Sequence, residues 1–391
     1  MNETEVKPRR RAGENGLSLE SEPTPKRGTR EGILSKVQKV LSDKIQKAVS
    51  TKGTARVAIF THKSPDPDAI GSQMGLTWLL QKAYENVEVV SFYDGHISHP
   101  QNQRMVNLLD PDLRPVTECN LSEFDLFISV DCVPANSVCP EATCYDLVID
   151  HHKEIPNGGF KGIFLNLKAG SCCSTIYQLI KQYKFSFEED NDLDSKVVTA
   201  LLVGIITDTE SLLSDDTTEI EHSTYAELFN FRNSSALKQI IKYKQPKEWV
   251  QARACVANAY NNVKESVLVH GIGFLDSNDR DLIAALSDEI LSWEGVEVAI
   301  VFAIIGGNRI AGSVRSSNAS IAVPTFCKEL GHQFGGEGGG KLGKGAYSYP
   351  LGGCANQDGE MDETTKDKLW EFILERETKR LLKHLRVSSD H

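Results

Sequence analysis

The chain has 391 residues, of which 40% are hydrophobic and 25% are charged; these proportions are near the average for globular proteins and exclude wholesale disorder. At roughly 150 residues per domain, the length predicts two or three folded units. The net charge is -11, and beyond residue 50 the chain carries 32 basic against 47 acidic side chains. An acidic body of this kind excludes tight non-specific binding of duplex DNA and suits a pocket in which carboxylates hold divalent cations.

Residues 1–31 are rich in Pro, Gly, Ser, Glu and Arg and are expected to form a disordered tail, because they have few apolar side chains to bury. In residues 32–50 apolar positions recur at helical spacing, which predicts an amphipathic helix. This helix is expected to pack on the first lobe or on another subunit, so a homodimer stays open.

Residues 51–229 alternate between apolar runs typical of strands and helical stretches. The expected strands are 56–61, 87–93, 124–130 and 145–149, and the expected helices are 64–80, 174–184 and 195–206. This alternation is typical of βαβ units and predicts an α/β fold with a mostly parallel sheet covered on both faces.

Residues 230–265 are polar and are expected to form a helical connector. Residues 266–391 predict a second, smaller lobe of mixed α/β type. Its expected strands are 267–275, 296–305 and 309–315, and its expected helices are 283–293, 321–334 and 364–385. The last two strands are expected to form a hairpin at Gly306 and Gly307.

Cellular location is indicated only by what the chain lacks. Nine cysteines occur without a C-x-x-C pair, which fits a reducing compartment. The longest apolar run, residues 298–305, is far shorter than the roughly 18 residues of a membrane span, and the N-terminus has no apolar signal core. We therefore expect a cytoplasmic protein that does not bind membranes.

A motif rich in metal-binding side chains follows the first expected strand. His62, Asp66 and Asp68 lie within seven residues of one another, at the strand end where ligands gather in open α/β sheets. Pro65 and Pro67 stiffen the turn between the carboxylates. Asp and Pro also make ordinary turns, so this motif alone leaves both a metal site and a simple turn open.

Further acids end other apolar segments. Asp131 and Asp150 each follow an expected strand, and Asp208 ends an expected helix. Two histidines, His151 and His152, come directly after Asp150. Any one of these residues could be a capping acid or a core histidine. Their recurrence at the ends of elements around one sheet favours a shared metal centre.

Carboxylates and imidazoles without a thiolate favour Mn or Mg, with Zn or Fe as alternatives, over a structural cysteine–zinc site. Two such ions, about 3.5 to 4 Å apart, can share a carboxylate, lower the pKa of a water and clamp a phosphoryl group for in-line attack. The residues therefore indicate phosphoester hydrolysis with two divalent metal ions as cofactors.

The motif set resembles that of the DHH phosphoesterases, which include RecJ-type exonucleases, nanoRNase and pAp phosphatases, cyclic-di-AMP phosphodiesterases and, more distantly, family II pyrophosphatases. The matching segments are His62-x-x-x-Asp66-x-Asp68-Ala-Ile-Gly-Ser, Val-Asp131-Cys, Asp150-His151-His152 and Thr-Asp208-Thr. The resemblance implies a DHH domain at residues 51–229 and a DHH-associated substrate domain at residues 266–391.

The resemblance also implies residue roles. The expected metal ligands are His62, Asp66 and Asp131 for one ion, and Asp68, Asp131, His151 and Asp208 for the other. Asp131 is expected to bridge the ions, Asp150 to orient an imidazole, and His152 to meet the substrate phosphate. These last three are the expected catalytic residues.

In the second lobe, residues 312–317 and the glycine-rich residues 334–346 resemble the family's substrate domain. Glycines let backbone N–H groups approach a phosphate, and Arg can bind one through two hydrogen bonds. A mobile surface loop is the alternative for the glycine-rich segment. The expected substrate-binding residues are Arg315, Ser316, Gly338, Gly339, Gly340 and Lys341.

One position departs from the family pattern. Gly340 stands where the family has a substrate-binding histidine, and Lys341, Lys344 and His332 are the side chains that could take over its role. This departure separates the substrate site of the chain from that of its nanoRNase relatives.

The expected function is a metal-dependent hydrolase that cleaves phosphate ester or phosphodiester bonds of short oligonucleotides, pAp-like nucleotides or cyclic dinucleotides. Its expected partner is a small nucleotide or a short single-stranded oligonucleotide, and not duplex DNA. An inorganic pyrophosphatase or exopolyphosphatase is one alternative. A non-catalytic nucleotide-binding regulator is another, although it requires lost metal ligands, and every expected ligand is present.

Overall fold

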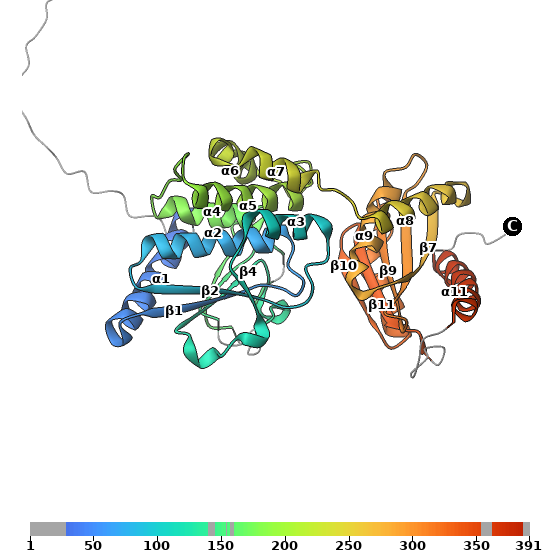
Figure 1. Cartoon of the computed structure of the whole chain (residues 1–391), viewed down its shortest axis with the longest axis horizontal. Helices are drawn as coiled ribbons and strands as arrows, with labels where there is room; N and C mark the ends of the chain where they lie inside the picture. The colour runs from blue at the N-terminus through green and yellow to red at the C-terminus, as the bar shows by residue number, and fades with distance from the viewer. Residues whose placement is uncertain (1–28, 140–144, 154, 157–159, 353–361, 386–391) are drawn as a thin grey trace, which may run out of the picture.

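The computed structural model describes residues 29–139, 145–153, 155–156, 160–352 and 362–385. They form two lobes, and the chain passes from one to the other between α7 (Ser234–Ile241) and α8 (Lys247–Asn258) (Figure 1). Residues 1–28 of the expected N-terminal tail lie outside the described residues.

The first lobe is built on a six-stranded sheet in the order β3-β2-β1-β4-β5-β6, with all neighbours parallel. Its strands are β1 (Ala55–Phe60), β2 (Val87–Tyr93), β3 (Leu113–Pro115), β4 (Leu126–Val130), β5 (Leu147–Ile149) and β6 (Ile163–Leu165). The predicted α/β class and parallel sheet are confirmed. Strands β3 and β6 are not evident from the sequence, because three residues are too few to show a periodicity.

Helices pack on one face of this sheet. The helices of the lobe are α1 (Arg30–Lys52), α2 (Pro67–Ala83), α3 (Pro100–Leu109), α4 (Cys172–Gln182), α5 (Asp192–Asp208), α6 (Glu219–Leu228) and α7. The buried side chains of α1, α2, α4 and α5 form one core with Val57 and Ile59 of β1. Helix α1 contacts α4 and β1, so it packs on the first lobe of its own chain.

Both faces of the first sheet are covered, as the sequence predicts, but helices cover only one of them. On the second face, Phe60 stacks on Phe92 at 5.3 Å between ring centroids and meets Tyr145 edge-on. Phe124 and the short segments around Val116 and Leu121 complete this cluster. A cover of aromatic rings and loop segments takes the place of helices, because these large side chains bury the face on their own.

The second lobe contains a five-stranded mixed sheet in the order β10-β11-β9-β8-β7, in which only β7 and β8 run parallel. The strands are β7 (Val267–Leu275), β8 (Val298–Ile305), β9 (Arg309–Ser316), β10 (Glu337–Lys341) and β11 (Lys344–Pro350). Helices α8 and α9 (Asp281–Leu291) cover one face. Helices α10 (Val323–Gln333) and α11 (Glu363–His384) cover the other. The predicted mixed α/β lobe is confirmed.

The helical segment expected as a connector is divided between the two lobes. Helix α7 packs against α3 and α5 of the first lobe, whereas α8 packs against β7 and α9 of the second. Trp249 of α8 is 1% exposed in the core of the second lobe. Only the residues between these helices cross from lobe to lobe.

The glycine-rich segment is a β-hairpin. Residues of β10 pair with β11, with Gly340 opposite Gly345 and Lys341 opposite Lys344. The sequence does not predict these strands, because glycine is depleted in strand interiors. Glycine is required at Gly338, where an added Cβ atom would lie 1.9 Å from the carbonyl oxygen of Cys327.

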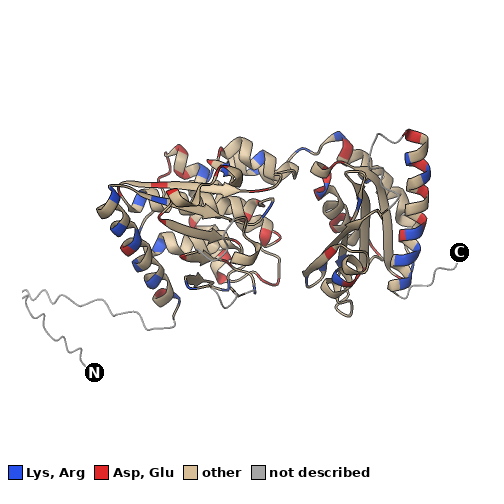
Figure 2. Ribbon diagram, turned by 90° about the horizontal axis from the view of Figure 1, so that it is seen from below, with Lys and Arg blue, Asp and Glu red and all other residues tan. Residues whose placement is uncertain are grey.

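No helix among the described residues is long and apolar enough to cross a lipid bilayer. Acidic and basic residues are spread along the ribbon of α11, the helix nearest the C-terminal end in Figure 2. Such charged residues are typical of a helix at the surface of a lobe, where they are exposed to water.

Candidate metal centre and substrate cleft

The order of the strands brings the predicted metal-binding residues together. The strand order reverses between β1 and β4, so the crevice at their carboxyl ends is the usual ligand position of an open α/β sheet. His62 follows β1, Asp131 follows β4, and Asp150 follows β5. Two helices complete the site, since Asp66 caps the start of α2 and Asp208 ends α5.

One group of potential ligands consists of His62, Asp66 and Asp131. The Nε2 atom of His62 lies 3.5 Å from Oδ2 of Asp131 and 3.9 Å from Oδ1 of Asp66. The same Asp66 oxygen accepts hydrogen bonds from the backbone N–H groups of Asp68 and Ala69, both at 3.0 Å. The helix start therefore fixes the direction of this carboxylate.

A second group consists of Asp68, His151 and Asp208. The Nε2 atom of His151 lies 3.2 Å from Asp208, 3.4 Å from Oδ1 of Asp131 and 3.8 Å from Asp68. Asp131 thus turns one oxygen to His62 and the other to His151. This is the geometry required of a carboxylate that bridges two ions.

The polar atoms between these groups fit a metal ion. His151 Nε2 and Asp131 Oδ1 are buried and have no hydrogen-bond partner among the described residues, which is costly unless another group satisfies them. Two ligands that each lie about 2.1 Å from one ion are roughly 3 to 3.5 Å apart, and the separations of 3.2 and 3.4 Å from Nε2 of His151 to Asp208 and Asp131 match this range.

Asp131 is held in a backbone conformation that few residues adopt. Its φ is 58°, in the left-handed region that Asp tolerates better than most side chains. Its backbone N–H donates to the carbonyl of Ile149 at 2.9 Å, and the residue is 3% exposed. Such strain is characteristic of functional positions, and here it turns the carboxylate between the two ligand groups.

Asp68 is hydrogen-bonded to the start of α4, a segment to which the sequence analysis assigns no function. Its two carboxylate oxygens accept hydrogen bonds from the backbone N–H groups of Cys172 at 2.6 Å and Cys173 at 2.9 Å. These residues open α4, so the helix N-terminus stabilises the negative charge. Ser171 ahead of the cysteines is a helix-cap signal in the sequence, but only the fold brings it to Asp68.

His152 faces the cleft and is oriented by Asp150. Its Nδ1 atom lies 2.8 Å from Oδ1 of Asp150, and that oxygen also accepts from the backbone N–H of His151 and of His152. The hydrogen bond to Asp150 raises the pKa of His152 against the opposing effect of burial. A protonated imidazole at this place suits contact with a phosphate oxygen.

The acids around His151 control its protonation. Burial disfavours the imidazolium, but the interaction with Asp131 and the charges of Asp68 and Asp208 outweigh it and raise the pKa of His151 to about 10. Burial and the charge of Asp131 raise the pKa of Asp68 well above its usual value. In the absence of metal, bound protons therefore offset part of the negative charge of these carboxylates, as metal ions would do.

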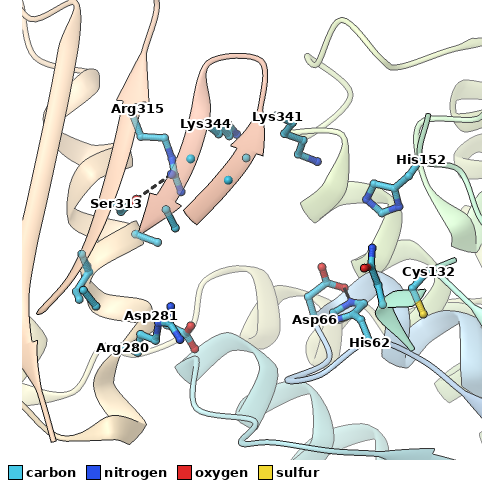
Figure 3. A pocket seen from close by; sticks show the side chains of 18 of the residues that line it. His62, Asp66, Cys132, His152, Arg280, Asp281, Ser313, Arg315, Lys341 and Lys344 are labelled. Carbon is cyan, nitrogen blue, oxygen red and sulfur yellow. Dashed lines mark hydrogen bonds and ion pairs between the residues drawn. The ribbon is translucent and has the colours of Figure 1, made fainter. Parts of the chain in front are cut away.

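A cavity of about 670 Å³ opens between the two lobes, lined on one side by the first ligand group with Asp150 and His152, and on the other by the second lobe. Figure 3 shows Asp66, His62 and His152 on one wall and Arg315, Lys344 and Arg280 on the other. Its size lies within the range of small-molecule sites.

Alternation along the strands decides which predicted substrate residues reach this cavity. Arg315, Gly339, Gly340 and Lys341 line it. Ser316 does not appear among the lining residues, because its side chain points to the other face of β9 and its hydroxyl caps the turn at Asn318. Gly338 is likewise packed against α10 and not against the cavity.

The position of Gly340 leaves no room for a histidine. Only its backbone borders the cavity, and an added Cβ atom would lie 2.2 Å from the carbonyl oxygen of Lys344. A Cβ atom at Gly339 would meet nothing within 4 Å. Of the three side chains suggested as replacements for the family histidine, Lys341 and Lys344 line the cavity, whereas His332 is not among its lining residues.

Several lining residues are missed by the sequence analysis. Arg280 and Asp281 lie at the start of α9, Ser313 lies on β9, and Cys132 follows Asp131. Burial raises the pKa of the Cys132 thiol to about 12, so it is a neutral neighbour of the site. The signal available for Arg280 and Asp281 was a charged pair ahead of a predicted helix, which by itself predicts only a helix start.

Comparison with known proteins matches both lobes. The model of the DHH family N-terminal domain matches residues 56–205, and the model of the DHHA1 domain matches residues 264–344. The first range contains His62, Asp131 and His151, and the second contains Arg315 and Lys341.

Curated relatives are distant. An uncharacterized protein of Methanocaldococcus jannaschii is 27% identical over 79% of this chain and 61% of its own length. A probable manganese-dependent inorganic pyrophosphatase of Lactiplantibacillus plantarum is 28% identical over 44% of this chain and 53% of its own length. The bifunctional oligoribonuclease and PAP phosphatase NrnA of Bacillus subtilis is 27% identical over 46% of this chain and 54% of its own length. The chain thus spans between 53% and 61% of these relatives.

The fold as a whole has a counterpart among solved structures. An exopolyphosphatase-related protein from Bacteroides fragilis aligns over 90% of this chain and 98% of its own, with a TM-score of 0.60 and 17% identity. At that identity the likeness concerns the fold. With both domain models matched in order, the chain belongs to the DHH family and carries a DHHA1 domain behind its N-terminal domain.

Proposed function

We propose that this chain is a two-metal phosphoesterase that cleaves phosphate ester or phosphodiester bonds of short oligonucleotides, pAp-like nucleotides or cyclic dinucleotides in the cavity between its lobes. The observation that carries the proposal is the position of Asp131. Its two oxygens face two separate ligand groups, directly beside a cavity whose opposite wall is cationic.

The protein side chains divide the work between metal and substrate. His62, Asp66 and Asp131 hold one ion, and Asp68, Asp131, His151 and Asp208 hold the other. When bound, a pair of divalent ions such as Mn supplies a nucleophile at neutral pH and neutralises charge on the phosphoryl group. The manganese dependence named for a pyrophosphatase relative supports Mn as the metal.

His152 and Asp150 act on the substrate side. The Asp150 carboxylate holds the His152 ring toward the cavity, and the raised pKa of that ring keeps it cationic over a wider pH range. A cation at this place binds a phosphate oxygen of the substrate and keeps it over the ligand groups.

The opposite wall binds the remainder of the substrate. Arg315 is fixed by Asp288 through two hydrogen bonds, at 2.6 and 3.2 Å, which leaves its third nitrogen toward Ser313 and the cavity. Arg315→Ala is therefore expected to raise KM and to leave the metal content unchanged. The oligoribonuclease and PAP phosphatase activities named for NrnA support a nucleotide substrate.

A hydrolysis panel tests the proposal. The full chain with Mn is offered pApA, pAp, cyclic-di-AMP, pyrophosphate and long single-stranded DNA, and each reaction is repeated with excess chelator. We expect turnover of at least one of the first three substrates, with no turnover in chelator or by Asp131→Asn. Turnover that persists after metal removal contradicts the two-metal reading.

The second candidate function is an inorganic pyrophosphatase, which the named activity of the Lactiplantibacillus plantarum relative favours. Pyrophosphate fills little of a cavity of about 670 Å³. Hydrolysis of pyrophosphate at a kcat/KM well above that of every nucleotide in the panel would replace our proposal with this one.

A further inference from the structure

Three cations form one row on the cavity face of the second lobe. Lys341 of β10 lies opposite Lys344 of β11, which in turn lies opposite Arg315 of β9. Because directly opposed residues share a face, the three side chains project together toward the first lobe (Figure 3). Like charges in this arrangement repel one another, so each needs a counter-charge from elsewhere.

Two of these counter-charges come from different lobes. Asp288 on α9 of the same lobe holds Arg315, as described above. Lys344 forms its ion pair with Glu210 of the first lobe. Lys341 forms no ion pair with any residue in the described part of the chain. Lys344 therefore forms an ion pair across the gap between the lobes, whereas the charge of Lys341 acts on Asp208 of the first lobe without an ion pair.

Glu210 is brought to this place by a strained turn. It follows the proposed metal ligand Asp208 by two residues, and Glu210, Ser211 and Leu212 have φ values of 50°, 63° and 69°. Three successive non-glycine residues in the left-handed region are unfavourable. Strain of this kind persists only where the surrounding structure imposes it.

Hydrogen bonds from the end of α5 impose the turn. The backbone N–H of Ser211 donates to the carbonyl of Ile206 at 2.7 Å, and that of Leu212 donates to the hydroxyl of Thr209 at 3.1 Å. Thr209 is itself fully buried and donates to Ile205. The direction of Glu210 is thus set by the same helix end that positions Asp208, and is not that of a free surface chain.

We propose that Glu210 occupies on Lys344 the place of a substrate phosphate and acts as a specificity-determining residue, because only a substrate with a phosphate beyond the scissile one can displace it. This inference rests on the proposed function. The Glu210 and Lys344 side chains are 57% and 43% exposed, so the pair is weak enough to exchange. In the presence of an anion that lacks this second phosphate, the Glu210 carboxylate stays paired with Lys344.

The two partners of the pair have opposite effects on binding if this is correct. Removing the charge of Glu210 frees Lys344 for the substrate, so Glu210→Gln is expected to lower the Kd for pApA about two- to five-fold, the range of one exposed ion pair. Lys344→Met removes the phosphate contact and is expected to raise the Kd about five-fold or more. If the Glu210–Lys344 ion pair only held the two lobes together, both variants would change the Kd in the same direction.

The experiment is calorimetric titration of the full chain with pApA in chelator, where nothing is hydrolysed, and with ApA, which lacks the second phosphate. ApA binding is expected to be unchanged in both variants. Glu375→Gln and Lys379→Met remove a matched exposed pair on α11 and are expected to change neither affinity.

Any other pattern overturns the inference: shifts of equal sign, no shift, equal shifts for ApA, or a wild-type chain that does not bind pApA. The Mn hydrolysis panel separates this failure from that of the proposed function. If wild type hydrolyses nucleotides but the shifts are absent, only the role of Glu210 falls. If pApA binding shifts as expected but no nucleotide is hydrolysed, the proposed hydrolysis of nucleotides is contradicted, and the role of Glu210 in substrate choice is contradicted with it.

Discussion

Metal binding should release protons, and His151 is one source of them. Its pKa of about 10 in the metal-free protein lies above the pH of any ordinary assay, so the ring is protonated before the metal arrives. A metal ion needs the neutral ring, and binding must therefore displace that proton. The sign is fixed by the direction of the shift: affinity rises with pH throughout the range below about 10.

The size of the effect follows from the count of displaced protons. Each proton changes the metal affinity about tenfold per pH unit, so one proton from His151 implies roughly a hundredfold gain between pH 6.5 and 8.5. Asp68, whose pKa burial raises well above its usual value, adds to the release. We therefore expect at least one proton per chain.

Titration of the chelator-treated chain with Mn in buffers of different ionisation enthalpy measures this number directly. His151→Ala should lower the count by about one. His152→Ala is the comparison variant: His152 also forms a group that could hold a metal ion with Asp131, Asp150 and His151, but its ring is bound to Asp150, so we expect the count to stay unchanged. A wild-type protein that releases no proton, with an affinity that is flat from pH 6.5 to 8.5, would refute the reasoning.

Three further predictions follow from single positions. His151→Ala should lower the metal content measured by elemental analysis, whereas His152→Ala should not; equal losses would contradict the separation of their roles. Gly340→Ala should lower the free energy of unfolding by about 1–3 kcal/mol because its Cβ atom meets the backbone of Lys344, and Gly339→Ala, with open space at that position, should cost far less; denaturant unfolding of both variants decides. Ser211→Gly should raise the free energy of unfolding by about 1 kcal/mol by relieving the positive φ, and an equally large loss would show that the turn is not strained.

Some features of the substrate lobe could not have been predicted. The glycine-rich segment offers no strand pattern, so its hairpin is visible only once β9 provides a partner for β11. The pairing then fixes alternation, which sends Lys341 to the cavity and leaves no side-chain room at Gly340. A comparison of motifs aligns Gly340 with a histidine, but it does not show whether a side chain fits at that position of the strand.

Several of the candidate metal-binding residues were within reach of the sequence because they end apolar segments. A single acid at the end of a buried strand or helix can be a simple cap, but several such acids with adjacent histidines around one sheet indicate one site. Asp131, Asp150 and Asp208 are all of this kind.

What the sequence determined by itself is therefore local: the βαβ alternation, the two lobes, and the residue types at the ends of β1, β4, β5 and α5. What only the tertiary structure decided is which atoms meet. The grip of α4 on Asp68, the pairing of Glu210 with Lys344, and the cationic row on the hairpin each join segments far apart in the chain. Such contacts depend on the packing of two sheets and their helices, and no local pattern of residues carries that information.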